Sequence, residues 1–256
     1  MLAAQRQSRI LAMVNQRGSL SITEMQRQLK VSRETIRRDL VVLAERNALR
    51  KAYGGALSLE RGEPEIAVRE VMNAAGKRAI GRLAASLVPD GASVILAGGS
   101  TVQSVADALL QRHGLTVFTN SVANCGRLAG RNKNRVYMLG GEIQAINGAA
   151  LGRDAARMLE HYFADFLFVG AGAISPTGWL MDYTPEEGEL HSLMLQSARS
   201  AVVVADHSKF NRYAPVRVDN FEKVTHLVTD RQPEAPVAGI LAGLPLELLV
   251  SDAQSR

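Results

Sequence analysis

Residues 31–46 read VSRETIRRDLVVLAER, and the pattern predicts one helix with two different faces. Ser32 can cap this helix, because its hydroxyl can accept a hydrogen bond from a backbone amide of the first turn. Ile36, Leu40 and Leu43 recur at the spacing of one helical face and form an apolar stripe. The opposite face is polar and strongly basic, and it consists of Arg33, Thr35, Arg37 and Arg38.

A second, shorter helix is predicted immediately upstream. Ser21 and Glu24 have the spacing of a capping box, which would open a helix that runs through Leu29. Residues 30–32 leave room only for a tight turn, and two helices joined in this way indicate a helix-turn-helix. A helix fits the major groove of DNA, where arginines near its N-terminal end reach base edges and others neutralise phosphates. By itself this stretch also fits a plain surface helix with a solvated basic face.

The flanking segments favour the DNA-binding interpretation. An amphipathic helix is predicted over about residues 3–16, with Ile10, Leu11 and Val14 facing inward. Residues 48–57 place a Gly-Gly turn between two short apolar pieces, which is the pattern of a small hairpin. Three helices followed by a basic hairpin predict a winged helix-turn-helix domain over residues 1–57.

These motifs resemble a known family. Val31 and Ser32, residues 35–40 (TIRRDL) and residues 53–56 (YGGA) are similar to the N-terminal signature of the DeoR family of bacterial transcriptional regulators. The resemblance implies that the partner of this domain is double-stranded operator DNA. The residues expected to contact DNA are Ser32, Arg33, Thr35, Arg37, Arg38, Lys51 and Tyr53.

The basic excess of the chain lies in this N-terminal segment. Residues 1–60 contain 11 Lys or Arg against 5 Asp or Glu, whereas the other residues contain 19 against 20. Attraction to a polyanion depends on such local density rather than on the net charge of +5. The charge distribution therefore supports a nucleic-acid partner for the first domain.

The sequence predicts a cytoplasmic protein with no membrane partner. No run reaches the roughly 20 apolar residues of a membrane span, and the N-terminus lacks the apolar core of a signal peptide. Cys125 is the single cysteine, so an internal disulfide is excluded and a reducing compartment is favoured.

A polar linker and a larger α/β domain are predicted after the hairpin. Residues 58–65 contain Gly62 and Pro64, which interrupt helices, so the second domain is expected over residues 66–256. It is expected to begin with one long helix over about residues 66–87. Short apolar runs then alternate with helical segments, which indicates a mostly parallel sheet covered on both faces by helices. The predicted strands are residues 93–96, 116–118, 135–139, 166–169, 201–204 and 224–228.

Glycine and small polar residues follow four of the predicted strands. Ligands of parallel sheets bind beyond the carboxyl ends of the strands, so these segments are expected to line a pocket. Residues 97–101 (AGGST) lead from a strand directly into a helix, and glycines, hydroxyl groups and a helix N-terminus together favour phosphate. For each segment alone, an ordinary turn is the alternative. The other three segments are residues 119–121, 140–141 and 170–172.

The DeoR resemblance extends over nearly the full chain. It implies an α/β effector domain similar in fold to ribose-5-phosphate isomerase, and a small phosphorylated, sugar-like metabolite as effector. Residues 98–101 would hold the phosphate, while Asp165, Glu187 and Lys209 would line the sugar end. The effector-binding residues implied by the resemblance are Gly98, Gly99, Ser100, Thr101, Thr119, Asn120, Ser121, Gly141, Asp165, Gly170, Glu187 and Lys209.

This chain departs from the family pattern at two positions. Ala97 stands where the family commonly has an acidic residue, and His191 stands where it commonly has a lysine. The loss of one carboxylate and one cation argues for an effector other than the commonest sugar phosphates. His191 is interpreted as a solvent-facing helix position rather than a pH-responsive contact. The role of His207, beside Asp206, stays open.

The combined interpretation is a DNA-binding transcriptional regulator, a repressor by resemblance, of a carbohydrate or related catabolic operon. Effector binding would shift the population of domain or subunit arrangements and so change operator affinity. One helix-turn-helix gives modest specificity, so a homodimer or homotetramer is expected. No catalytic residue, metal or cofactor is expected. A dinucleotide is disfavoured, because Gly170 and Gly172 are not followed by a third glycine and a helix.

Two other functions stay open at this level. A sugar-phosphate isomerase-like enzyme with a nucleic-acid-binding tether could use Glu187 or Asp165 as its base. The lack of an acid at position 97 and the attached DNA reader count against that function. An architectural or RNA-binding protein without an effector would leave the four glycine-rich strand ends without a purpose.

Overall fold

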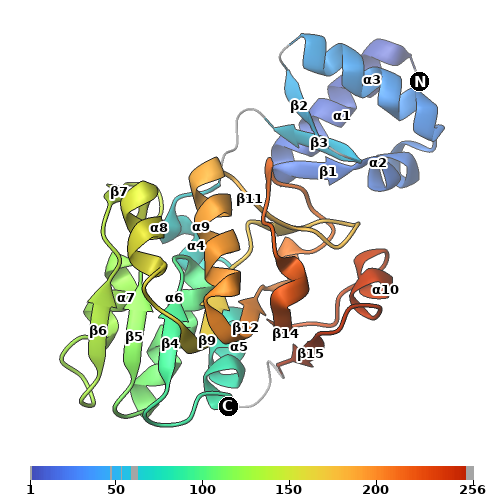
Figure 1. Cartoon of the computed structure of the whole chain (residues 1–256). Coiled ribbons are helices and arrows are strands. Elements are labelled where there is room, and N and C mark those ends of the chain that lie inside the picture. The colour runs from blue at the N-terminus through green and yellow to red at the C-terminus, as the bar shows by residue number, and fades with distance from the viewer. Residues whose placement is uncertain (1, 47, 53, 59–62, 252–256) are drawn as a thin grey trace.

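The computed structural model describes residues 2–46, 48–52, 54–58 and 63–251, and the first three of these ranges form a winged helix-turn-helix (Figure 1). The sheet of this domain is antiparallel with the order β1-β3-β2, so the predicted hairpin gains a third strand that the sequence did not predict. The elements are α1 (Ala3–Arg17), β1 (Ser19–Ser21), α2 (Ile22–Leu29), α3 (Arg33–Glu45), β2 (Leu49–Ala52) and β3 (Gly55–Ser58).

Side-chain caps begin two of these helices where the sequence places them. The Ser21 hydroxyl accepts a hydrogen bond of 3.1 Å from the backbone nitrogen of Glu24, and Ser32 accepts one of 3.1 Å from that of Thr35. These bonds satisfy amides that have no partner inside the helix. The apolar stripes of α1, α2 and α3 then meet in one core whose most buried members include Ile10, Met25 and Ile36.

A partly buried ion pair joins the outer helices α1 and α3 of this domain. Asp39 lies on the inner face of α3, between the apolar positions, and is buried. Its carboxylate accepts hydrogen bonds from Nε and Nη2 of Arg6 on α1, the latter at 3.1 Å, and from Nε2 of Gln7 at 3.1 Å. The orientation of α3 relative to α1 is therefore fixed by charge as well as by apolar packing.

In residues 63–251 a seven-stranded sheet has the order β15-β14-β12-β9-β4-β5-β6, and all its neighbouring strands are parallel. The predicted α/β class is confirmed. Strand order reverses between β9 and β4, so loops leave these two strands in opposite directions and open a crevice at their carboxyl ends. The strands are β4 (Ser93–Leu96), β5 (Thr116–Thr119), β6 (Arg135–Met138), β9 (Ala164–Val169), β12 (Ala198–Val204), β14 (Val224–Thr229) and β15 (Glu247–Val250).

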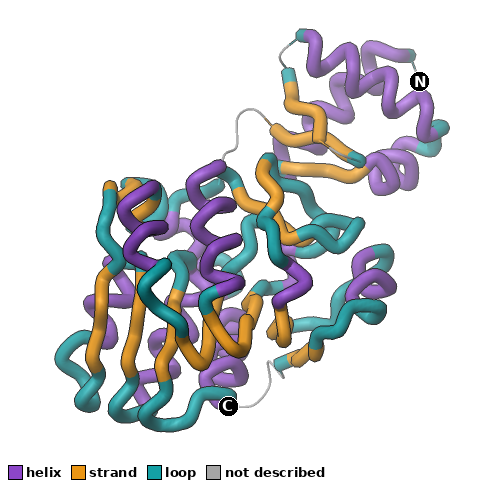
Figure 2. The backbone as a smooth tube through the Cα atoms, in the orientation of Figure 1, coloured by secondary structure: helices purple, strands orange, loops and turns teal. Residues whose placement is uncertain are grey.

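Helices cover both faces of this sheet (Figure 2). One buried cluster packs α5 (Ala74–Ser86), α6 (Ser100–Ala108) and α7 (Val122–Leu128) on one face. Another packs α8 (Arg153–Leu159), α9 (Pro185–Gln196) and α10 (Val237–Leu241) on the other. The short elements are η1 (Leu109–Gln111), β7 (Glu142–Gln144), β8 (Ala149–Leu151), β10 (Ala173–Ile174), β11 (Leu180–Asp182), η2 (His207–Lys209), β13 (Val216–Arg217) and η3 (Phe221–Lys223). No helix in the described ranges has the length and apolar content needed to cross a membrane.

The single long helix expected over residues 66–87 is wrong. The structure has α4 (Ile66–Val71) and α5, separated at Asn73, which adopts a left-handed conformation with φ of 51°. Asparagine tolerates this conformation better than most residues. Its side chain also donates a 2.9 Å hydrogen bond to Asp230. Because of this break, the axis of α4 does not continue that of α5, and Arg69 on α4 reaches the pocket at the carboxyl edge of the sheet.

The wing turn of the first domain packs against the second domain. A Cβ atom added to Gly54 would lie 2.4 Å from the hydroxyl of Tyr213, and one added to Gly55 would lie 3.1 Å from the same ring. Gly54 also has a positive φ of 81°. Glycine is required at position 54 both by backbone conformation and by this close approach.

We predict that Asp39→Ala destabilises the N-terminal domain. The substitution removes the acceptor of three hydrogen bonds from Arg6 and Gln7, and because the pair is only partly buried the expected cost is about 2 kcal/mol, between the values for exposed and buried pairs. Urea unfolding of the full chain measures the effect. Glu45→Ala, which removes an exposed carboxylate from the end of the same helix, serves as the control and should change stability little. Equal stability of the two variants would contradict the structural role of Asp39.

Candidate functional site

The exposed face of α3 carries the residues predicted to contact DNA. Arg33, Arg37 and Arg38 are exposed, and Arg37 and Arg38 lie 4.0 Å and 3.6 Å from the carboxylate of Glu34. Such exposed pairs are weak, so they leave the guanidinium groups free to rearrange toward phosphates or base edges. Ser32 is exposed at the helix N-terminus, where backbone amides favour a phosphate.

The remaining predicted contacts lie around this face. Thr35 is half-buried, and its hydroxyl lies 2.8 Å from that of Ser32. Lys51 is exposed on β2 of the wing. Tyr53 lies outside the described residues. The structure thus presents a contiguous basic face on α3 with a lysine on the neighbouring hairpin.

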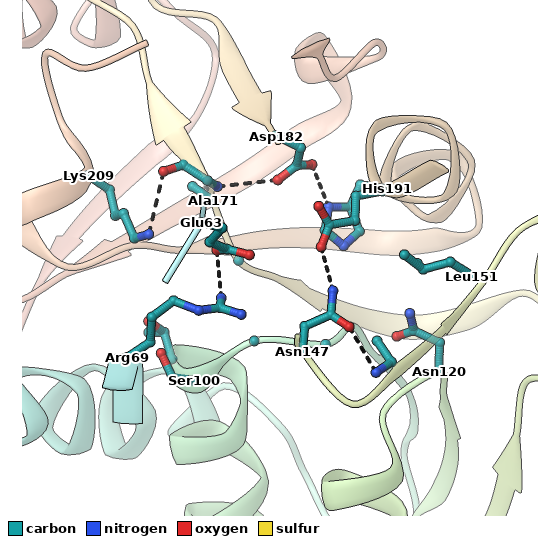
Figure 3. A pocket seen from close by; sticks show the side chains of 17 residues that line it. Glu63, Arg69, Ser100, Asn120, Asn147, Leu151, Ala171, Asp182, His191 and Lys209 are labelled. Carbon is teal, nitrogen blue, oxygen red and sulfur yellow. Dashed lines mark hydrogen bonds and ion pairs between the residues drawn. The ribbon is translucent and has the colours of Figure 1, made fainter. Parts of the chain in front are cut away.

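A polar pocket lies where the strand order reverses, at the carboxyl ends of β4 and β9 (Figure 3). It has a cavity volume of about 40 Å³. Eight of the twelve residues implied by the family resemblance line it: Gly98, Gly99, Ser100, Thr101, Asn120, Gly170, Glu187 and Lys209. The other lining residues are Glu63, Arg69, Asn147, Ala149, Leu151, Ala171, Gly172, Asp182 and His191.

The segment after β4 forms the floor of the pocket as an anion-binding turn. Gly99 occupies the N-cap position of α6 with φ of 123°, a conformation that only glycine adopts readily. No side chain caps this helix, and Gly98, Gly99, Ser100 and Thr101 line the cavity, so the uncapped helix start lies at the pocket. Hydroxyl donors, free amides and the positive end of a helix dipole together favour a phosphate group.

Arg69 on α4 supplies a buried cation beside this turn (Figure 3). Its side chain is 10% exposed, Nη1 lies 2.6 Å from Oε1 of Glu63, and Nε donates to the backbone oxygen of Pro64 at 2.8 Å. Lys77 on α5 donates to the backbone oxygen of Arg69, which holds α4 in place. Nη2 of Arg69 is buried, and no hydrogen-bond partner for it lies among the described residues. A buried guanidinium N–H without a partner is costly, and an anion in the pocket would satisfy it.

Lys209 adds a second cation from η2. Its Nζ lies 3.4 Å from the backbone oxygen of Gly172, at the carboxyl end of β9. Burial lowers the pKa of Lys209, although the carboxylates of Glu63 and Asp206 partly oppose that effect. The amine is therefore held in a poorly hydrated place where a second negative charge would favour its protonated form.

His191 is a buried partner of Asp182, so its interpretation as a solvent-facing residue is wrong. Nδ1 of His191 lies 2.7 Å from Oδ2 of Asp182, whose Oδ1 accepts a 3.3 Å hydrogen bond from the backbone nitrogen of Gly172. Burial lowers the pKa of His191, but the charge and hydrogen bond of Asp182, with the charge of Glu187, outweigh it and leave the pKa raised. His191 lies on the face of α9 that forms the pocket wall, so its side chain is buried.

Two further polar side chains complete the wall beside α9. Oε1 of Glu187 accepts a 2.6 Å hydrogen bond from Nδ2 of Asn147, and its Oε2 accepts one of 3.2 Å from the Thr184 hydroxyl. Asn147 in turn accepts a 3.1 Å bond from the backbone nitrogen of Ala149. Carboxylates and amides arranged in this way can bind the hydroxyl groups of a small polar ligand.

Asp165 does not belong to this site, which corrects its expected place at the sugar end. It is the second residue of β9 and therefore lies at the amino end of the sheet, opposite to the pocket. Its carboxylate accepts hydrogen bonds from the Ser93 backbone nitrogen at 3.0 Å and the Ser93 hydroxyl at 2.7 Å. These bonds lower the pKa of Asp165 and give it a structural role that joins β9 to β4.

Three other implied residues shape the pocket without lining it. The Thr119 hydroxyl donates to the backbone oxygen of Leu96 at 2.7 Å, and the Ser121 hydroxyl caps α7. Gly141 has a φ of 126°, and a Cβ there would lie 2.8 Å from the backbone oxygen of Leu151. Each of them fixes a loop at the carboxyl edge of the sheet.

The sequence did not predict five polar residues of the lining: Glu63, Arg69, Asn147, Asp182 and His191. Arg69 falls within residues 66–87, which were expected to form one helix, and nothing in their pattern indicates that it reaches the pocket. Asp182 ends β11, a strand of three residues that is too short to predict from its pattern. His207, which stayed open, pairs with Asp230 at 2.7 Å and lies outside the pocket. Ala97 is fully buried in the core, and its backbone oxygen accepts a 3.0 Å hydrogen bond from Asn124.

Two family models match this chain. A DeoR-like helix-turn-helix domain matches residues 6–62, and a DeoR C terminal sensor domain matches residues 72–231. The chain belongs to the DeoR family. It is a DNA-binding transcriptional regulator and not an enzyme, so the isomerase-like alternative does not apply.

Members of the DeoR family match nearly the whole chain. The HTH-type transcriptional repressor CsqR of Escherichia coli (strain K12) is 32% identical over 251 residues, which cover 96% of this chain and 94% of that protein. The glycerol-3-phosphate regulon repressor of Haemophilus influenzae is 36% identical over 234 residues, which cover 91% of each. Among solved structures, ribose 5-phosphate isomerase A from Methanocaldococcus jannaschii covers 52% of this chain and 53% of its own at 20% identity. Its TM-score of 0.37 is too low to bear on function.

We predict that Arg37→Ala weakens operator binding by this DeoR-family regulator. If Arg37 reads a base edge, the loss amounts to about 1–3 kcal/mol, or roughly 5- to 150-fold in affinity. A mobility-shift titration with the DNA upstream of its own gene measures it. Arg131→Ala removes an exposed arginine from the second domain and should leave the affinity unchanged. Equal affinities of the two variants would contradict the assignment of α3.

We also predict a pH-dependent contribution of His191 to stability. Because the folded pKa is raised, the contribution is complete below the unfolded value of about 6.5 and is lost as pH rises through the folded pKa. The free-energy difference between the wild type and His191→Gln should therefore shrink as pH rises above about 6.5. Urea unfolding across this range gives the difference. His161→Gln, at an exposed histidine, is the control. A constant difference would rule out the raised pKa.

Proposed function

We propose that this DeoR-family protein represses an operon for carbohydrate or related catabolism, and that a small phosphorylated metabolite in the pocket controls its operator affinity. The basic face of α3 and the wing would contact the operator. The observation that carries the effector assignment is the anion site formed by the glycine turn at α6 and the unpaired Nη2 of Arg69. Both features bind a charged acceptor more strongly than a neutral one.

The wall opposite this anion site supports a polyhydroxy compound as the rest of the effector. Asp182 lies across the cavity from Ser100 (Figure 3), and Glu187 and Asn147 add a carboxylate and an amide to the lining. Related proteins include glycerol-3-phosphate regulon repressors, which supports a phosphorylated polyol or sugar of few carbon atoms. The cavity of about 40 Å³ is too small for such a ligand as it stands, so binding must enlarge it.

Operator recognition is expected to need more than one copy of the chain. A single helix-turn-helix covers one half-site and gives modest specificity. We propose that a homodimer or a homotetramer binds two half-sites in the cytoplasm, with effector binding changing their relative placement.

A mobility-shift assay tests this function. The full chain is titrated on its own upstream DNA at low salt, with and without glycerol 3-phosphate, other phosphorylated polyols, phosphorylated sugars and their unphosphorylated forms. We expect at least one phosphorylated compound to change the affinity and its unphosphorylated form to have no effect. Failure to bind DNA would refute the regulator's proposed operator contacts, and a response without phosphate dependence would refute the anion site.

We predict that Thr101→Ala blunts this response. The loss of one hydroxyl donor to a phosphate should raise the effector concentration needed by roughly tenfold, with little change in operator affinity without effector. Thr116→Ala makes the same change at the amino end of β5 and is the control. Equal loss of DNA binding and effector response would show that residues 98–101 are not the phosphate site.

A further inference from the structure

Glu63 places a linker carboxylate inside the pocket of the second domain. Only residues 59–62 separate it from Ser58, the last residue of β3 in the DNA-binding domain. Its side chain is 10% exposed, and Oε1 lies 2.6 Å from Nη1 of Arg69. The carboxylate of Glu63, a residue of the segment between the domains, is therefore paired with Arg69, the cation that the proposed function assigns to the effector's phosphate.

The same residue forms a wall between two cavities. Glu63, Asn147, Leu151 and Glu187 line both the small pocket and a neighbouring cavity of about 410 Å³. The larger cavity lies between the domains, since its other lining residues include Arg50 and Ser58 from the first domain and Tyr183, Thr184 and Pro215 from the second. Removal of the Glu63 side chain would join the two cavities and give the room that the small pocket lacks.

The chemistry of this position makes the carboxylate easy to replace. Burial raises the pKa of Glu63 to about 7, against the attraction of Arg69 and Lys209, and the charges of Glu187 and Asp182 add to the rise. The ionised form is therefore costly at this position. A phosphate dianion has more oxygen acceptors than a carboxylate, so it can bond Nη1 and the unpaired Nη2 of Arg69 together with the amides of α6.

We propose that Glu63 is a tethered competitor for the phosphate group of the effector, and that effector binding expels it from Arg69 and thereby displaces the linker segment that leads to the DNA-binding domain. This inference rests on the proposed function, because it takes the pocket as the phosphate site. It adds how occupancy of the pocket reaches the operator-binding domain. A ligand that favours the expelled arrangement shifts the population toward it by its differential affinity.

Anion titrations of full-length variants test the competition. Glu63→Gln keeps the shape and removes the charge, and Glu63→Ala also opens the cavity. Both should bind inorganic phosphate roughly tenfold more tightly than the wild type, measured by calorimetry or thermal shift. Glu65→Gln, at an exposed carboxylate of the same segment, should match the wild type. Equal or weaker binding by both Glu63 variants, with measurable binding by the wild type, would overturn the inference. Absence of phosphate binding in all four proteins would refute the proposed anion site itself.

A pH series separates charge competition from a change in shape. Sulfate is used as the probe because its charge is constant near neutral pH. Wild-type affinity should fall more steeply than that of Glu63→Gln as pH rises through about 7, since the competing carboxylate becomes ionised over this range. Arg69, Lys209, Asp182, Tyr183, Glu187 and His191 also face Glu63 and are present in both proteins. The charge of Glu63 raises the pKa of Lys209, Tyr183 and His191, so any difference in their titration between the two proteins is itself an effect of that charge. Parallel profiles would overturn the inference.

Operator affinity provides the readout of the coupling. Without any effector, Glu63→Ala should shift the affinity in the same direction as a saturating phosphorylated effector shifts that of the wild type. Glu65→Gln should not shift it. Wild-type affinity in Glu63→Ala, together with a full response of the wild type to effector, would show that expulsion of Glu63 does not reach the DNA-binding domain.

Discussion

The parallel pairing of β4 with β9 is the constraint on which the second domain depends. Val94, Ile95 and Leu96 pair with Phe166, Leu167 and Phe168. The strands that follow β4 in the chain lie on one side of this pair, and those that follow β9 lie on the other. The loops after β4 and β9 consequently diverge, and a cavity remains between them. The glycine turn, α6 and the loop that follows β9 all take their places from this pairing. Asp165 and Ser93 fasten the opposite edge by side-chain and backbone hydrogen bonds.

Buried charge sets the properties of this cavity. Arg69, Lys209 and His191 face Glu63, Asp182 and Glu187 in a space with little room for water, where each charge depends strongly on its neighbours. The set has nearly balanced formal charge without a ligand, and it leaves one guanidinium nitrogen unbonded. A pocket built in this way favours an anion that can replace a resident carboxylate. That property follows from the positions of the charges and not from their number.

The residues through which the two domains touch are close in sequence to residues that line the pocket. Tyr213 packs against the wing turn at Gly54 and Gly55, and Lys209 lies four residues before it. On the other side of the same domain boundary, Glu63 follows β3 of the wing and enters the pocket. The wing is therefore joined to the pocket wall through two separate segments, and both carry a charged residue that faces Arg69. This arrangement provides the short physical connection that the proposed coupling between the ligand site and the DNA-binding domain requires.

The sequence by itself determined what depends on local pattern. Ile36, Leu40 and Leu43 predicted the inner face of α3, Ser21 and Ser32 predicted the starts of α2 and α3, and residues 98–101 indicated the anion turn. These features follow from spacing and capping, which act over a few residues. Tertiary structure alone decided that Arg69, Asp182, His191 and Glu63 meet at one site and that Asp165 does not. The turn at Asn73, the register of β9 and the inward face of α9 set these positions, and each depends on contacts between segments far apart in the chain. Burial then fixed the charge states, because the free energy of an ionised side chain depends on its surroundings in space and not on its neighbours in sequence.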